Sequence, residues 1–148
     1  MIRRSANAVL VELAPHERAF LGQLPSMLDD VTRGDDPGHA VLHRDAYDDA
    51  ERSAEFDGLV ASDRTRIRAE DRTIATRVAD GDTALTPDEA RSLLRCINEA
   101  RLVMAARSGV FDEGPGWEDR MDTDPVAAAV GWLGYVQSQL IQALDDGP

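Results

Sequence analysis

Two histidines followed by aspartates are the residues best suited to metal chemistry. His39 and His43 are four positions apart and would share one face of a helix, and Asp45, Asp48 and Asp49 follow closely. Imidazole and carboxylate groups together can bind a divalent metal ion. The glutamate of a metalloprotease HExxH motif is absent, so a polar loop beside a helix start is the favoured interpretation. A metal-binding protein or hydrolase that uses these residues is the alternative.

Residues 78–89 resemble half of a calcium-binding EF-hand loop. Asp80, Asp82 and Glu89 occupy the third, fifth and twelfth positions of such a loop. The first ligand and the central glycine are both missing, and a loop without them rarely coordinates calcium. We therefore expect Asp82 to serve a turn, and we expect the protein to carry no metal or other cofactor.

The single cysteine, Cys96, cannot form an internal disulfide. A chain without disulfides is typical of the reducing cytoplasm. No histidine and carboxylate stand near Cys96 in an arrangement typical of a nucleophile, and the chain has no glycine-rich phosphate loop or CxxC motif. We expect a half-buried structural thiol and a protein that is not an enzyme.

The arginines form a candidate docking surface on an acidic chain. The formal net charge is -12, which disfavours direct binding to nucleic acid and favours basic protein partners. Arg64, Arg68 and Arg72 stand four residues apart along one face of a predicted helix. Two interpretations are open: a solvated face of ion pairs, or a stripe that docks an acidic partner helix or a phosphate.

Residues 86–109 form the most clearly delimited helix of the sequence. Thr86 and Glu89 complete an N-terminal capping box. Gly109 suits the left-handed backbone position that ends a helix.

Two polar residues, Asn98 and Arg101, interrupt the apolar stripe of this helix. A buried amide or guanidinium must be matched by partners, because leaving it unpaired is costly. We expect both residues to act as a structural clamp to a neighbouring helix. An acid of the long helix or of residues 112–124 is the expected partner of Arg101, and a ligand site is the alternative.

Apolar periodicity predicts three further helices. One begins at Pro15 and is kinked or divided at Pro25, a long one covers residues 48–79, and the last covers residues 125–144. Residues 7–13 alternate weakly and favour a short strand or an extended arm.

These elements predict an all-α fold in a single domain. Residues 1–14 form the N-terminal arm or strand, and residues 15–145 form a bundle of about four principal helices. No segment is long and apolar enough to span a membrane.

The last helix is more apolar than one buried stripe requires. Trp132, Tyr135 and Ile141 lie beside or opposite that stripe. Exposed apolar patches usually mark contacts with other molecules. We therefore predict a homodimer and a partner-binding surface that includes Trp132 and Tyr135.

Four segments, in this order, resemble a known family. They are DAYDDA (45–50), the run from Asn98 to Leu102, Arg107 with Gly109, and WLGYVQ (132–137). Together they are similar to an actinobacterial family of unknown function, which is named after the oxidative-stress transcriptional regulator AosR. The resemblance covers nearly the whole chain.

The resemblance implies a small cytosolic helical protein, often encoded beside the ClpS protease adaptor. It also implies action through a protein partner in transcription, such as a sigma factor. A switch by internal disulfide would need a second cysteine beside Cys96. We expect a non-enzymatic regulatory protein, with the metal-binding protein and a purely structural homodimer as alternatives.

Overall fold

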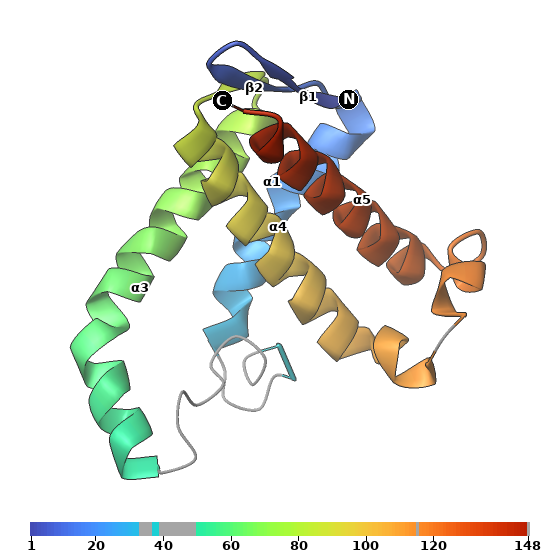
Figure 1. Cartoon of the computed structure of the whole chain (residues 1–148). Coiled ribbons are helices and arrows are strands. Elements are labelled where there is room, and N and C mark those ends of the chain that lie inside the picture. Colours follow the sequence, from blue (N-terminus) through green and yellow to red (C-terminus); the bar gives the residue numbers. More distant parts are fainter. Residues whose placement is uncertain (33–36, 39–49, 115, 148) are drawn as a thin grey trace.

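Four helices that spread from one small sheet make up the fold (Figure 1). The computed structural model describes residues 1–32, 37–38, 50–114 and 116–147, and for residues 32, 50–64 and 113 it describes the backbone only. Over this part of the chain the long helices are α1 (Pro15–Asp29), α3 (Ala50–Ala79), α4 (Pro87–Ser108) and α5 (Pro125–Asp145). The predicted all-α fold with four principal helices is confirmed.

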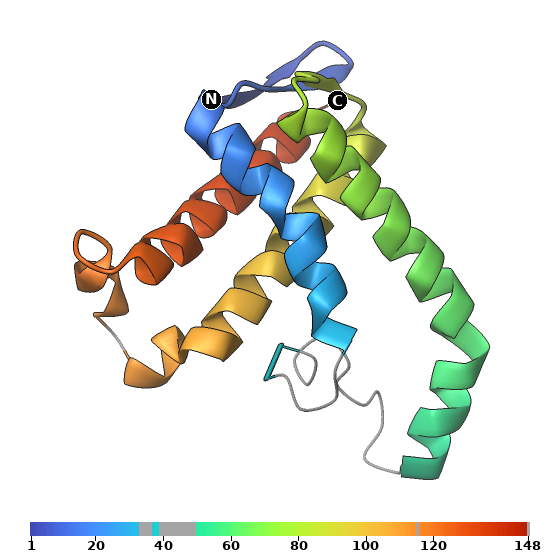
Figure 2. The same cartoon turned by 180° about the vertical axis from the view of Figure 1, so that it is seen from behind.

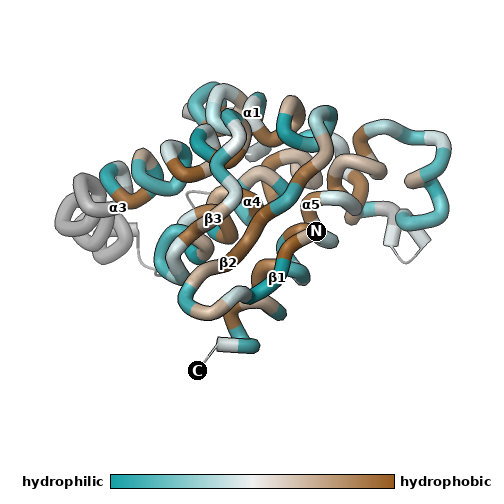
Figure 3. The backbone as a smooth tube through the Cα atoms, turned by 90° about the horizontal axis from the view of Figure 1, so that it is seen from above, coloured by the Kyte–Doolittle hydropathy of each residue, from teal (hydrophilic) through white to brown (hydrophobic). Residues whose placement is uncertain are grey.

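The N-terminal arm is a β-hairpin that belongs to a three-stranded sheet. β1 (Ile2–Ser5) and β3 (Ala84–Leu85) both pair antiparallel with β2 (Ala8–Val11), which is the central strand. Figure 3 shows this sheet across one end of the helices. The sequence predicted one strand here, so β1 and β3 are additions.

The first helix continues through Pro25 without a break. The interpretation of two shorter helices is therefore wrong. A proline inside a helix costs about 3 kcal/mol because it removes a backbone hydrogen bond. Burial of the apolar stripe of α1 offsets this cost, since Leu21, Leu24 and Leu28 are almost fully enclosed.

Helix α4 is the central element. It contacts α3 on one flank and α5 on the other, and α1 crosses it on the rear face (Figure 2). Its ends are those the sequence predicts: the Glu89 N–H donates to Thr86 Oγ1 at 3.1 Å, and the Thr86 N–H donates to Glu89 Oε2 at 2.9 Å. Gly109 ends the helix at φ 68°, where a side chain would be strained.

The core fills the space between α4, its three neighbouring helices and the sheet. Helix α3 diverges from α4 with distance from the sheet, whereas α5 runs beside α4 (Figures 1 and 2). In the described residues, no helix is long and apolar enough to cross a membrane. The largest fully enclosed side chains include Leu24, Val9, Leu85, Leu93, Ile97, Leu133 and Leu140.

Candidate functional site

A ladder of ion pairs joins α3 to α4. Arg68 Nε donates to Glu99 Oε1 at 3.2 Å, Arg95 pairs with Asp71, and Arg77 Nη1 donates to Glu89 Oε1 at 2.8 Å. From one ion pair to the next, the residue on α3 lies three to six positions later in the sequence, and its partner on α4 lies four to six positions earlier. This order is expected for two antiparallel helices. The ladder therefore fixes which turn of α3 faces which turn of α4.

The central rung is a bidentate pair with one buried partner. Arg95 Nε donates to Asp71 Oδ2 at 3.0 Å, and Arg95 Nη2 donates to Asp71 Oδ1 at 2.7 Å. Asp71 is 3% exposed and is the one buried charged residue in the described part of the chain. Its carboxylate raises the pKa of the Arg95 guanidinium. The fork of an arginine matches a carboxylate in this way, so the pair has directional specificity.

The rung nearest the sheet also ties the α3–α4 turn to both helices. Arg77 donates to Asp82 Oδ2 through Nε at 3.1 Å and to Glu89 through Nη1. The Arg77 guanidinium lowers the pKa of the Asp82 and Glu89 carboxyl groups. The Ala84 N–H donates to Asp82 Oδ1 at 3.3 Å, which agrees with the expectation that Asp82 serves a turn.

Two of the three arginines in the predicted docking stripe, Arg68 and Arg72, lie between helices. Arg68 pairs with Glu99 of α4, and Arg72 pairs with Asp29 of α1. Their side chains are only 21% and 24% exposed. Two of the three arginines expected to dock a partner thus bind acids of their own chain. The side chain of Arg64 lies outside the described residues.

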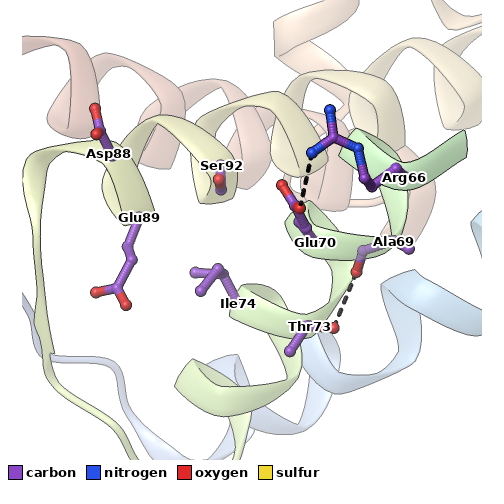
Figure 4. Close-up of a pocket in the computed structure, with 8 residues that line it drawn as sticks. All are labelled: Arg66, Ala69, Glu70, Thr73, Ile74, Asp88, Glu89 and Ser92. Atoms are coloured by element: carbon purple, nitrogen blue, oxygen red, sulfur yellow. Dashed lines mark hydrogen bonds and ion pairs between the residues drawn. The ribbon is translucent and has the colours of Figure 1, made fainter. Parts of the chain in front are cut away.

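A shallow groove of about 450 Å³ runs beside the ladder, between α3 and α4 (Figure 4). Ile74 lies between the two helices, with Glu70 and Arg66 further along α3. The groove carboxylates bind arginines: Glu70 pairs with Arg66, Asp88 with Arg91, and Glu89 with Arg77.

Cys96 is fully buried in α4 rather than half-buried as expected. It is 1% exposed, and desolvation raises the pKa of its thiol to about 12, with Glu99 and Asp71 adding to the effect. A thiolate is the reactive form, and burial disfavours it. The geometry therefore agrees with a structural thiol.

The two polar residues of α4 both face α5, and Arg101 lacks the acid partner that the sequence predicts. Gln137 Nε2 donates to Asn98 Oδ1 at 3.2 Å, which is an interhelical contact of the kind a clamp makes. Arg101 has no ion pair with an acid of the described residues, and its Nε atom is buried without an acceptor. Its Cζ atom lies over the Phe111 ring, 5.1 Å from the centroid. The expected acid partner is thus replaced by an aromatic ring.

Two candidate partner-binding residues on α5 have different surroundings. The Trp132 indole N–H donates to Glu17 Oε2 at 2.6 Å, and its ring packs edge-on against Phe20 at 5.4 Å. Trp132 is therefore engaged with α1 and partly buried. Tyr135 is 58% exposed and Ile141 is 44% exposed, so these two remain available at the surface.

His39 and His43, with Asp45, Asp48 and Asp49, which form the alternative metal site, lie outside the described residues. Among the residues that the structure does describe, no group of three or more histidine, cysteine or acidic side chains could hold a metal ion.

Sequence reasoning missed the residues that complete these contacts. Asp71 and Glu99 were not assigned to Arg95 and Arg68, and Glu17 was not linked to Trp132. The signal present in the sequence was an alternation of acids and arginines on two consecutive helices. An antiparallel alignment of residues 68–77 with residues 89–99 would have indicated the ladder.

The chain matches a known protein family over nearly its whole length. The family model for the domain of unknown function DUF2017 matches residues 1–144. No curated protein and no solved structure matches the chain.

We predict that Cys96 is unreactive in the folded protein. At pH 8 almost no thiolate exists for a group whose pKa is about 12. A thiol reagent should modify native protein more than about a hundredfold more slowly than protein in denaturant. Mass spectrometry of samples quenched over time would measure both rates, and comparable rates in the two states would contradict the assignment of a structural thiol.

Proposed function

The chain belongs to the DUF2017 family of domains of unknown function, and we propose that it is a non-enzymatic regulatory protein that acts by binding other proteins. The similarity of its sequence to the family of the oxidative-stress regulator AosR supports a role in stress-linked transcription. A sigma factor or another transcription component in an actinobacterial cytoplasm is the proposed partner.

The observation that carries this proposal is a surface strip on α5. Tyr135 and Ile141 are both exposed large apolar side chains. Ser138 stands three residues from each, so the three residues form a continuous strip along the helix. The Ser138 hydroxyl donates to the Gly134 carbonyl at 3.0 Å and therefore needs no partner from outside. When a partner covers this strip, no polar group of the strip is left without a hydrogen bond, and apolar surface is removed from water.

The charge of the chain supports a protein partner over a nucleic acid. The net charge of -12 repels phosphate backbones and attracts basic protein surfaces. A homodimer is a second use of the same strip, since a two-fold interface brings identical patches together.

We predict that loss of the strip abolishes capture of the partner. A tagged chain, cross-linked in its native cells before and after peroxide treatment, should enrich a sigma factor or another transcription component. The double variant Tyr135→Ser/Ile141→Ser should lose that protein, whereas Val126→Ser should retain it. Val126 is a matched control, because it is 38% exposed on the same helix but lies outside the strip.

Enrichment that is equal for the strip variant and the original chain would contradict the assignment of the strip. Enrichment of only metabolic enzymes or nucleic acid would contradict the regulatory role.

We also predict that the isolated protein is a homodimer. Light scattering of the purified chain at high concentration should give twice the chain's 16.1 kDa, and Tyr135→Ser/Ile141→Ser should give the single-chain mass. A mass near 16.1 kDa for the original chain at high concentration would exclude the dimer.

A further inference from the structure

Arg101 differs from the arginines that surround it. On α3 and α4, six other arginines pair with carboxylates of the same chain, whereas Arg101 pairs with none in the part of the chain that the structure describes. The paired set is Arg66, Arg68, Arg72, Arg77, Arg91 and Arg95. Arg4 and Arg18 also have no ion pair with an acid of the described residues, but neither of them lies on α3 or α4.

The side chain of Arg101 is held in place by groups that accept no hydrogen bond from it. Its Cζ atom lies over the Phe111 ring, and Phe111 is itself supported edge-on by Trp117 at 5.3 Å. On the α5 side it abuts Gly134, where an added Cβ would lie 3.2 Å from Arg101 Nε. The Gly134 carbonyl is already occupied, because it accepts the Ser138 hydroxyl.

This arrangement leaves one edge of the guanidinium for a ligand. Nε is buried against α5 and lacks an acceptor, whereas the residue as a whole is only partly buried. An oxygen ligand would therefore approach end-on, at Nη1 and Nη2. A guanidinium that has already lost part of its hydration, and whose position is fixed, binds an anion at a lower ordering cost than a mobile surface arginine.

We propose that Arg101, held between Phe111 and Gly134, is a binding site for a single carboxylate. The fork of two N–H groups matches the two oxygens of a carboxylate. The net charge of -12 opposes a doubly charged phosphate more strongly than a singly charged carboxylate. This site deepens the proposed function, on which its biological use rests, because an Asp or Glu side chain of the partner can supply the carboxylate beside the strip on α5.

The test is a titration of the isolated full chain, followed by NMR of the arginine Nε–H groups. The Arg101 signal is identified by its absence from the spectrum of Arg101→Lys. The probes are N-acetylglutamate N-methylamide, an alanine-rich helical peptide with one glutamate, and inorganic phosphate. A saturable shift of the Arg101 signal with a carboxylate probe is expected.

Three variants test the geometry. In Arg101→Lys the backbone shifts of Gly134 report binding, and the Kd should rise about tenfold, because an ammonium cannot offer the planar fork. Gly134→Ala should raise the Kd about threefold, since its Cβ would displace the fork. Arg91→Ala removes an exposed arginine of the same helix and should leave the Kd unchanged. Circular dichroism confirms that each variant is folded.

The outcomes distinguish the possible sources of the carboxylate, and they test the site at Arg101 separately from the proposed function. Tighter binding of the peptide indicates a protein carboxylate, and tighter binding of the free amino-acid derivative indicates a small carboxylate; both support the site. Phosphate binding tighter than either probe, no saturable shift, or an equal response in Arg101→Lys would overturn it. Because the titration needs no partner, its failure would leave the proposed function standing, and failure of partner capture alone would leave the site standing.

Discussion

The contact between Asp71 and Arg95 is the constraint on which the arrangement of the helices depends. Asp71 is almost completely buried, and its two oxygens accept two N–H groups from Arg95. A buried carboxylate without its arginine would be strongly unfavourable, so α3 and α4 must meet in the register that brings these residues together. An apolar contact tolerates sliding by one turn far better than this pair does. The pair thus specifies geometry, whatever its net contribution to stability.

The other rungs extend the same register toward both ends of the interface. Arg77 joins the turn at Asp82 to the first turn of α4 at Glu89, so the connection between the helices is fixed where the capping box begins. Arg68 and Glu99 form the rung on the far side. Helix α3 has few buried apolar side chains among its described residues, namely Ile74, Ala75 and Val78. Polar contacts must therefore contribute much of the specificity with which α3 packs against α4.

The fixed α3–α4 pair also determines which face of α4 packs against α5. The carboxylate site proposed at Arg101 lies at this second interface. Asn98 contacts Gln137 and Arg101 contacts Gly134, which places both polar residues of α4 along its interface with α5. The same helix thus uses arginines in two ways. Toward α3, Arg95 is neutralised by Asp71, and toward α5, Arg101 lies on an aromatic ring and has no ion pair with an acid of the described residues.

The sequence predicted the local features well and the distant contacts poorly. The limits of α4 follow from Thr86, Glu89 and Gly109, whose effects act within one helical turn. Partners far apart along the chain carry no such local signal: Glu99 lies 31 residues from Arg68, and Glu17 lies 115 residues from Trp132. The strand at residues 84–85 is too short to show any periodicity, since only pairing with β2 defines it.

A double-mutant cycle measures the Asp71–Arg95 constraint most directly. The free energies of unfolding of Asp71→Ala, Arg95→Ala and the double variant are compared with that of the original chain by chemical denaturation. A buried bidentate pair that sets the register predicts a favourable coupling of about 2 kcal/mol, with Arg95→Ala the more damaging single change because it leaves the buried carboxylate unpaired. A coupling below about 0.5 kcal/mol, as found for exposed pairs, would contradict the role of this contact.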